Sequence, residues 1–386
     1  MDTVIYLDNN ATSRVDPAVV EAMLPFFTKE YGNPSSMHVF GGHIHAEVER
    51  ARARVAALIN ADPSEIIFTS CGSESNNMAV FGGVGAISPD TTVITSRVEH
   101  PSVLEPCREL KERGHRVIEV GVMADGTLDI DGYSAALATP GKKFVSLMWA
   151  NNETGVVFPM KQAAEKAQAA GAIFHTDAVQ AVGKMSEVDV AKVPVNMLTL
   201  SGHKLHAPKG VGALYVRRGT RVKPFLRGGH QERGLRAGTE NVPYIVGLGL
   251  AAELAAAELS NGASRIAMMR DRLEAGLLLC PDASVNGNRQ LRLPNTLNIS
   301  FAYIEGEAIL YHLSDAGICA SSGSACTSGS LEPSHVIRAM GVPFTSVHGS
   351  IRFSFSKYNT EADVDHVLAV TPGIVDKLRA LSPFVS

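Results

Sequence analysis

The stretch FVSLMWANNETGVVFPMKQAAEKAQAAGAIFHTD, residues 144–177, decides the fold class. It opens with a short apolar run (144–149), continues with alanines and charged residues at helical spacing (160–170), and closes with a second apolar run (172–174). Short apolar runs are typical of buried strands, and the middle segment is typical of an amphipathic helix. Strand, helix and strand in this order predict a βα unit within a mainly parallel sheet.

The same alternation fills the first two thirds of the chain and extends the prediction to a whole sheet. Further apolar or β-branched runs lie at 66–69, 91–95, 197–200 and 212–216, and a second expected helix lies at 47–59. We therefore predict an α/β fold with a mainly parallel sheet in its larger part.

The pattern of expected helices and strands changes to a mixed α+β one near Ala263, after an alanine-rich helical stretch. A chain of 386 residues has room for two domains, at about 100–200 residues each. We predict a large domain at 15–262 and a smaller α+β domain at 263–386. The residues alone leave open which domain the start of the chain packs against, and we group residues 1–14 with the small domain.

Composition argues against several classes of protein. The net charge of −4 gives no basic field for a phosphate backbone, so we expect no nucleic-acid partner. The first residues have no apolar core of signal-peptide length, and no apolar run approaches the roughly 18 residues that cross a bilayer. We therefore expect a cytoplasmic protein without a membrane partner. The five cysteines are an odd number without CxxC spacing, which is typical of reduced thiols.

Five of the expected strands each end in a polar cluster instead of a plain turn. In open α/β sheets, ligands bind outside the carboxyl ends of the strands, so we expect these five loops to meet at one pocket. The clusters are SCGS at 70–73, EH at 99–100, NNE at 151–153, DAVQ at 177–180 and SGHK at 201–204.

The first and last of these clusters suit a phosphate group. Gly72 allows close backbone approach, and Ser73 offers a hydroxyl at an expected helix N-terminus, where free N–H groups and the helix dipole attract anions. Ser201 and His203 would supply further donors. Each residue alone has a plainer explanation, because Ser73 could simply cap its helix and the other two could lie in an ordinary turn between strands.

Lys204, Asp177 and His100 suit a cofactor that carries an aldehyde and an aromatic ring. Lys204 directly follows an apolar strand, and burial makes a lysine amine nucleophilic toward aldehydes. Asp177 can pair with the pyridinium nitrogen of pyridoxal phosphate, and His100 can stack on a ring or shuttle a proton. A surface lysine, a helix-capping aspartate and a structural histidine are the plainer explanations of each residue alone. Together with phosphate donors on neighbouring strand ends, the three point to pyridoxal phosphate.

Three further residues suit oxygen atoms of a cofactor or a substrate. Asn152 and Gln180 are neutral hydrogen-bonding groups for a cofactor oxygen or a substrate carboxylate. Arg352 lies in the alternating stretch SIRFSF at 350–355, where its guanidinium can bind a carboxylate through two hydrogen bonds. An arginine on a surface strand is the alternative.

Cys326 lies in SSGSACTSGS at 321–330, ten residues without a bulky side chain. Such a segment cannot pack tightly, and the resulting exposed thiol favours a reactive role. A transient iron–sulfur contact at Cys326 is a further hypothesis, because no multi-cysteine site could hold a cluster permanently.

With these segments in view, the chain resembles the cysteine desulfurases of the class V pyridoxal-phosphate aminotransferase family, over essentially its whole length. Within that family it is similar to the NifS type, which serves nitrogenase maturation, through GGHQERGLRAGTEN at 228–241. Ser73 replaces the family's usual threonine but keeps the hydroxyl. The resemblance is carried by YLDNNAT (6–12), FTSCGSES (68–75), WANNETG (149–155), HTDAVQ (175–180), SGHKLHAPKGVG (201–212), RAGTEN (236–241) and SSGSACTSGSLEPSHV (321–336).

The resemblance implies a type I aminotransferase fold with a seven-stranded sheet, and a homodimer in which Thr239 reaches the phosphate in the neighbouring subunit's site. It implies pyridoxal 5′-phosphate as the cofactor and L-cysteine as the substrate. The implied roles are these: Lys204 holds the cofactor, Asp177 binds its pyridine nitrogen, His100 stacks on its ring, Gln180 binds its ring oxygen, Gly72, Ser73, Ser201, His203 and Thr239 surround its phosphate, and Asn152 and Arg352 bind the substrate carboxylate.

The implied activity converts L-cysteine to L-alanine and leaves the sulfur on Cys326 as a persulfide, for delivery to an iron–sulfur scaffold protein. Three alternatives stay open: a housekeeping desulfurase, a related pyridoxal-phosphate aminotransferase, and a non-enzymatic thiol carrier. Transamination does not require the Cys326 segment, and a thiol carrier does not require the five polar strand ends.

Overall fold

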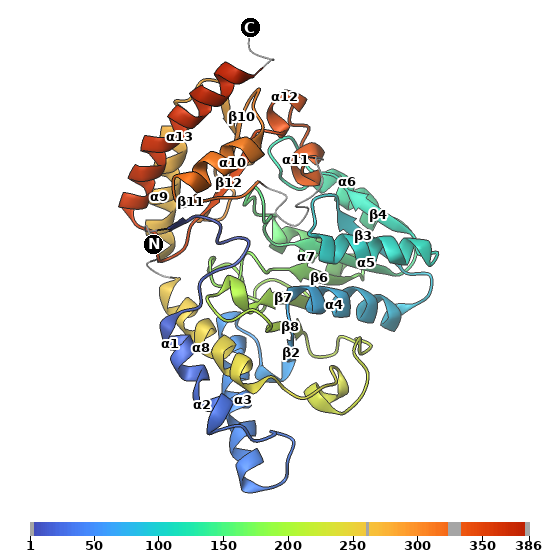
Figure 1. The fold of residues 1–386 in the computed structure, drawn as a ribbon. Coiled ribbons are helices and arrows are strands. Elements are labelled where there is room, and N and C mark those ends of the chain that lie inside the picture. Colours follow the sequence, from blue (N-terminus) through green and yellow to red (C-terminus); the bar gives the residue numbers. More distant parts are fainter. Residues whose placement is uncertain (1–3, 260–261, 323–332, 383–386) are drawn as a thin grey trace.

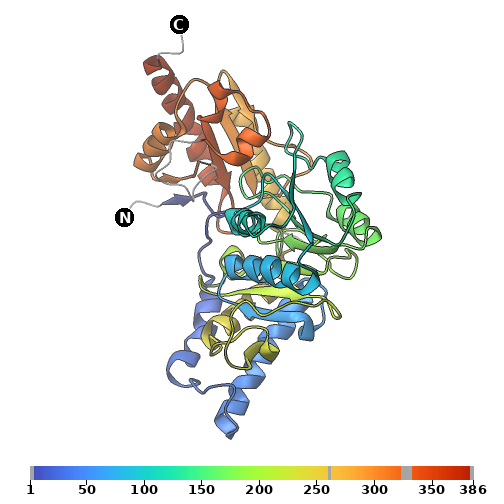
Figure 2. The same ribbon diagram turned by 90° about the vertical axis from the view of Figure 1, so that its right-hand side faces the viewer.

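The computed structural model describes residues 4–259, 262–322 and 333–382. A large layered part surrounds a central sheet, and a smaller part above it carries the C-terminal helices (Figure 1). In the view turned by 90°, the N-terminal segment begins beside the smaller part and runs down to the helices of the larger one (Figure 2).

The central sheet has seven strands in the order β2-β8-β7-β6-β5-β3-β4. Only β8 among these strands runs against its neighbours, so the carboxyl ends of the other six lie at one edge. The prediction of a mainly parallel sheet is confirmed. The strands are β2 (Ile66–Thr69), β3 (Thr92–Ser96), β4 (Val117–Val120), β5 (Lys143–Met148), β6 (Ile173–Asp177), β7 (Met197–Ser201) and β8 (Gly212–Val216).

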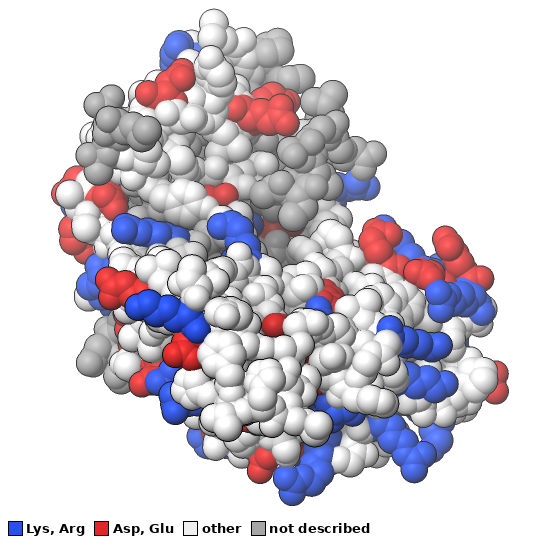
Figure 3. Space-filling model, turned by 60° about the horizontal axis from the view of Figure 1, so that its bottom comes forward, with Lys and Arg blue, Asp and Glu red and all other residues white. Residues whose placement is uncertain are grey.

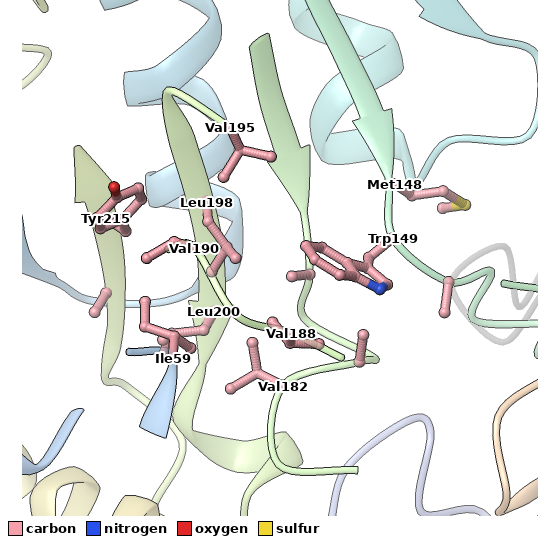
Figure 4. Close-up of a cluster of buried hydrophobic side chains, with 14 of the residues drawn as sticks. Ile59, Met148, Trp149, Val182, Val188, Val190, Val195, Leu198, Leu200 and Tyr215 are labelled. Atoms are coloured by element: carbon pink, nitrogen blue, oxygen red, sulfur yellow. The ribbon is translucent and has the colours of Figure 1, made fainter. Parts of the chain in front are cut away.

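Alternate side chains of the central sheet enter two separate apolar cores, as the period-two geometry of a strand requires. Phe144 and Met197 pack on one face with helices α4 and α5. Val145 and Leu198 pack on the opposite face, in the core that Figure 4 shows around Trp149. The helices of this part are α1 (Pro17–Met23), α2 (Pro25–Thr28), α3 (Val39–Leu58), α4 (Gly72–Ile87), α5 (Pro101–Glu112), α6 (Ile130–Leu137), α7 (Met160–Ala169) and α8 (Val242–Glu258), with the 3₁₀ turns η1 (Pro63–Glu65), η2 (Gly202–Lys204) and η3 (Gln231–Gly234).

The smaller part is built on a three-stranded antiparallel sheet in the order β12-β10-β9. The first strand of the chain, β1 (Ile5–Tyr6), pairs with β11 (Ile318–Cys319), and Leu7 joins the core of this smaller part. The domain boundaries given above stay a prediction. The remaining elements are β9 (Ala283–Val285), β10 (Thr296–Phe301), β12 (Ser350–Ser354), α9 (Gly262–Leu277), α10 (Gly306–Asp315), α11 (His335–Ala339), α12 (Phe344–Val347) and α13 (Glu361–Leu381).

Two elements differ from the sequence-based expectation. Strand β4 was not predicted, because it is a four-residue edge strand, VIEV, whose exposed Glu119 interrupts the apolar pattern. Helix α3 begins at Val39 instead of residue 47, because its first turn contains two glycines that conceal its helical character and His38 accepts a hydrogen bond from Gly41 N there.

On the face in Figure 3, acidic and basic side chains are interspersed. In the described part of the chain, no single helix is long and apolar enough to cross a bilayer; the sharply bent pair α8 and α9 reaches that limit only when both helices are counted together.

Candidate active site

A cavity of about 540 Å³ lies at the carboxyl edge of the central sheet. The loops after β2, β3, β5, β6 and β7 all contribute to its wall, so the five polar clusters do meet at one place. Their roles stay predictions. The predicted site residues that line the cavity are Gly72, Ser73, His100, Asn152, Asp177, Gln180, Ser201, His203, Lys204 and Arg352.

Two predicted residues do not line this cavity. Thr239 lies in a separate hollow with Arg236 and Gly238, so within one chain it does not reach the predicted phosphate position. Cys326, including its hypothetical iron–sulfur contact, lies outside the described residues. Among the described residues, no group of three histidine, cysteine or carboxylate side chains could hold a metal ion.

Lys204 lies at the end of η2 and points toward the N-terminal segment. Its Nζ donates hydrogen bonds to the carbonyl oxygens of Asn10 (2.5 Å) and Ala11 (2.6 Å). Both of these residues line the cavity, and their part in the site was missed. The signal available in the sequence was the polar cluster DNNAT at 8–12, which follows a short apolar run.

The residues predicted to bind a phosphate group have the features that such an anion requires. Helix α4 begins at Gly72, where an added Cβ would come within 3.0 Å of Val179 Cγ2, so glycine keeps the approach open. Ser201 Oγ is buried without a hydrogen-bond partner among the described residues, which is costly unless a ligand satisfies it. Burial, with the positive charge of Lys204 as the next cause, lowers the pKa of His203 to about 3, so this ring is neutral at pH 7. These residues fit a phosphate group.

Asp177, the last residue of β6, lines the cavity. Its Oδ1 accepts from Val179 N (3.0 Å) and its Oδ2 accepts from Asn76 Nδ2 (2.7 Å). Asn76 also donates to Ser102 Oγ (2.8 Å), and Ser102 Oγ lies 2.7 Å from His100 Nδ1. Asn76 and Ser102 were not singled out from the sequence, because a helical asparagine and a serine near a helix start are common surface residues.

Gln180 connects the cavity wall to a second lysine. Its Nε2 donates to the carbonyl oxygen of Asn10 (3.0 Å), and its Oε1 accepts from Lys184 Nζ (2.9 Å). Burial, then the positive charges of Lys204 and Arg352, lowers the pKa of Lys184 to about 7. Since a backbone carbonyl oxygen only accepts, the contact with Asn10 fixes the amide orientation of Gln180.

Arg352 lies in the middle of β12 with 2% of its surface exposed, so the alternative of a surface arginine is wrong. Its Nη2 lies 2.6 Å from Asp8 Oδ1, and its Nη1 donates to the carbonyl oxygen of Asn152 (3.0 Å). Its Nε is buried without a partner in the described structure. The guanidinium is thus already bound to a carboxylate of this chain, and Asp8 was missed.

Two buried carboxyl groups adjoin the cavity wall. Burial raises the pKa of Glu99 to about 8, although its Oε1 accepts from Ser96 Oγ and Met148 N. Burial likewise raises the pKa of Glu153 to about 7. Glu153 accepts a short hydrogen bond from Ser334, which caps helix α11.

The chain segment that contains Cys326 begins and ends at this cavity. On one side, Ser321 pairs through its backbone with Arg352. On the other side, Pro333, Ser334 and His335 line the cavity.

Comparisons with known proteins agree on one family. The family model described as aminotransferase class-V matches residues 5–367. A cysteine desulfurase of Nostoc sp. is 57% identical over 383 residues, which span 99% of this chain and 95% of the relative. The cysteine desulfurase NifS of Azotobacter vinelandii is 54% identical over 384 residues, which span 99% of this chain and 95% of that protein.

A solved structure titled NifS-like protein superposes with a TM-score of 0.91 at 38% identity, and covers 97% of this chain and 100% of that chain. A NifS-like protein from Rickettsia africae gives a TM-score of 0.88 at 32% identity and covers 97% of this chain and 100% of that chain. The expected type I aminotransferase fold is thereby confirmed. The chain belongs to the class-V aminotransferase family, within its cysteine desulfurase branch.

Proposed function

We propose that the chain is a pyridoxal-phosphate-dependent cysteine desulfurase that converts L-cysteine to L-alanine and keeps the sulfur on Cys326 as a persulfide. The observation that carries the proposal is the cavity itself. It combines a lysine, a carboxylate, a histidine and a phosphate cradle, and both described ends of the Cys326 segment meet its wall. The named relatives support the same activity.

The residues present would hold pyridoxal phosphate from three directions. The start of α4 with Ser73, Ser201 and His203 would surround the phosphate, Asp177 would pair with the ring nitrogen, and Lys204 would hold the aldehyde carbon. When bound, the cofactor supplies an electron sink that stabilises negative charge at the substrate Cα.

The chain's own groups would then carry out the remaining chemistry. Lys204 Nζ would move the proton at the substrate Cα, and Arg352 with Asn152 would orient the substrate carboxylate. The Cys326 thiolate would attack the substrate sulfur, so that an S–S bond forms as the Cβ–S bond breaks. The balance is L-cysteine and a Cys326 thiol on one side, and L-alanine and a Cys326 persulfide on the other.

The physiological setting is part of the same proposal. The NifS relative supports a role in nitrogenase maturation, and general supply of sulfur for iron–sulfur and thio-cofactor assembly is the alternative. We propose a cytoplasmic homodimer in which Thr239 completes the phosphate site of the neighbouring subunit, with a scaffold protein as the sulfur acceptor. The position of Thr239 outside its own chain's cavity supports this arrangement.

An absorption spectrum with product analysis tests the proposed function. The cofactor-loaded protein should show a visible band that changes when L-cysteine is added, and L-alanine should form in proportion to sulfide when a thiol reductant is present. A visible band with keto acid as the product would favour the aminotransferase instead. Fully folded, cofactor-supplemented protein without any band would leave only the thiol carrier.

A further inference from the structure

A directed line of hydrogen bonds joins Asp177 to His100 through Asn76 and Ser102. All four residues line the cavity. Asn76, in α4, is 1% exposed, and Ser102 lies in the first turn of α5, which His100 caps. The line therefore connects Asp177 to His100 through two side chains that have no role in the proposed function.

The carboxylate fixes the orientation of Asn76. A carboxylate accepts hydrogen bonds and has none to donate, so Asn76 must present its NH₂ group to Asp177 Oδ2 at 2.7 Å. The second hydrogen of that group reaches Ser102 Oγ at 2.8 Å. This orientation leaves Asn76 Oδ1 buried without a partner among the described residues, which costs free energy. The two hydrogen bonds that the NH₂ group donates outweigh that cost.

The orientation of Asn76 in turn fixes the ring of His100. Because Ser102 Oγ accepts from Asn76, its own proton is available for His100 Nδ1 at 2.7 Å. The same ring nitrogen accepts the backbone N–H of Ser102 at 3.1 Å. A ring nitrogen that accepts hydrogen bonds carries no proton, so a neutral imidazole here carries its proton on Nε2.

The surroundings keep this ring neutral near pH 7. Burial is the main cause that lowers the pKa of His100, and the positive charge of Lys204 on η2 acts in the same direction. Asp177 on β6 opposes them without reversing the result.

We propose that Asn76 and Ser102 are positioning residues that hold His100 as the neutral ring with its proton on Nε2. In this state the ring enters the reaction as a hydrogen-bond donor to the bound amino acid, and not as a base. The inference rests on the proposed function, because it concerns the histidine of that site. It adds that His100 donates a hydrogen bond from Nε2 and does not accept a proton, and it identifies Asn76 and Ser102 as the residues that impose this state.

Nitrogen NMR of protein carrying ¹⁵N-labelled histidine and bound pyridoxal phosphate tests the tautomer directly. The chain has 13 histidines, and the signals of His100 are assigned as those lost in His100→Gln. The wild-type ring should show an unprotonated Nδ1 and a protonated Nε2. A wild-type ring with its proton on Nδ1 would overturn the inference.

Variants of the two positioning residues sharpen the same measurement. Ser102→Ala should move the His100 signals toward a tautomer mixture, and Ser102→Thr, which keeps the hydroxyl, should restore the wild-type pattern. Asn76→Leu removes the donor to Ser102 without placing a second carboxyl group against Asp177, so it should also move the His100 signals toward a tautomer mixture. Ser134→Ala is the matched control, because Ser134 donates only within α6. Unchanged His100 signals in both Ser102→Ala and Asn76→Leu would contradict the proposal.

Kinetics separate this inference from the proposed function. Ser102→Ala should lower kcat about threefold to tenfold, the worth of one neutral hydrogen bond, with the KM for L-cysteine changed less than about twofold. A wild-type protein that forms persulfide but has the opposite tautomer would reject the inference and keep the proposed function. The expected tautomer in a protein that forms no persulfide would reject the proposed function alone.

Discussion

The carboxyl edge of the seven-stranded sheet and the strand β12 of the three-stranded sheet both bring charged side chains to one cavity, in different ways. In the large sheet the charges follow the strands: Asp177 is the last residue of β6, and Lys204 lies in the turn after β7. In the small sheet, Arg352 lies in the middle of a strand whose five residues are all buried. At the strand ends, Asp177 accepts hydrogen bonds from Val179 N and Asn76 Nδ2, whereas the buried guanidinium of Arg352 forms an ion pair with Asp8.

The first prediction concerns the positive charge at the strand ends, which is Lys204. Lys204→Ala should abolish turnover, with a loss of at least about 10³-fold in L-alanine formation, because in the proposed function this residue is both nucleophile and proton carrier. The fold should survive, since Lys204 lies in a turn and not in a core strand. Lys209→Ala is the control, because Lys209 is an exposed lysine in the same loop. Sustained turnover in Lys204→Ala would remove the residue from the site.

The second prediction removes the mid-strand charge. Arg352→Gln should lower the free energy of unfolding by about 3 kcal/mol, because Asp8 loses its buried partner, and should raise the KM for L-cysteine at least about tenfold. Urea unfolding and steady-state kinetics measure the two effects. The double variant Arg352→Gln with Asp8→Asn should regain part of the stability and none of the affinity. Equal KM values for wild type and Arg352→Gln would contradict the substrate role.

The third prediction concerns Ser201, at the end of β7. Its hydroxyl is buried without a partner among the described residues, so Ser201→Ala should leave the stability of the cofactor-free protein unchanged or slightly higher. The affinity for pyridoxal phosphate should fall about tenfold, the worth of a hydrogen bond to a charged group. Equilibrium titration of the cofactor-free protein measures this affinity. Ser186→Ala, at an exposed serine, should leave it unchanged.

The fourth prediction concerns Glu99, in the loop after β3 of the large sheet, and the pH dependence of the free energy of unfolding. The folded-state pKa of Glu99 is raised to about 8 by burial, above its value in the unfolded chain. The stability that its neutral form provides is complete below about pH 4 and is lost as the pH rises toward 8. Glu99→Gln should therefore gain stability relative to wild type between pH 5 and pH 8, by at least about 1.4 kcal/mol.

Urea unfolding at the two pH values measures this gain. Glu119→Gln, at the exposed glutamate of β4, should show no such change. An equal difference between wild type and Glu99→Gln at both pH values would contradict a buried, neutral Glu99.

The same contrast between sheets explains what the sequence could predict. The strand-end residues were found because a parallel sheet buries continuous apolar runs, so a polar cluster after each run is conspicuous. The stretch around Arg352 was correctly predicted as a strand from its alternation. Its burial was not predictable, because both faces of β12 are covered and the polar face resembles one exposed to water.

The residues that were missed act through contacts distant in sequence. Asp8 reaches Arg352 across 344 positions, and Asn10 reaches Lys204 across 194. Asn76 and Ser102 lie on helices where polar side chains normally meet solvent. Only the packing of α4 and α5 on the sheet turns these two toward the cavity.

The mass of the peptide that contains Cys326, measured without reductant after brief exposure of the cofactor-loaded protein to L-cysteine, tests the central claim most directly. The proposed function predicts one added sulfur atom on this peptide, matched by one L-alanine released, and no added sulfur in Lys204→Ala. Formation of L-alanine and sulfide at the wild-type rate by Cys326→Ala, or turnover that leaves the Cys326 peptide unmodified, would contradict it.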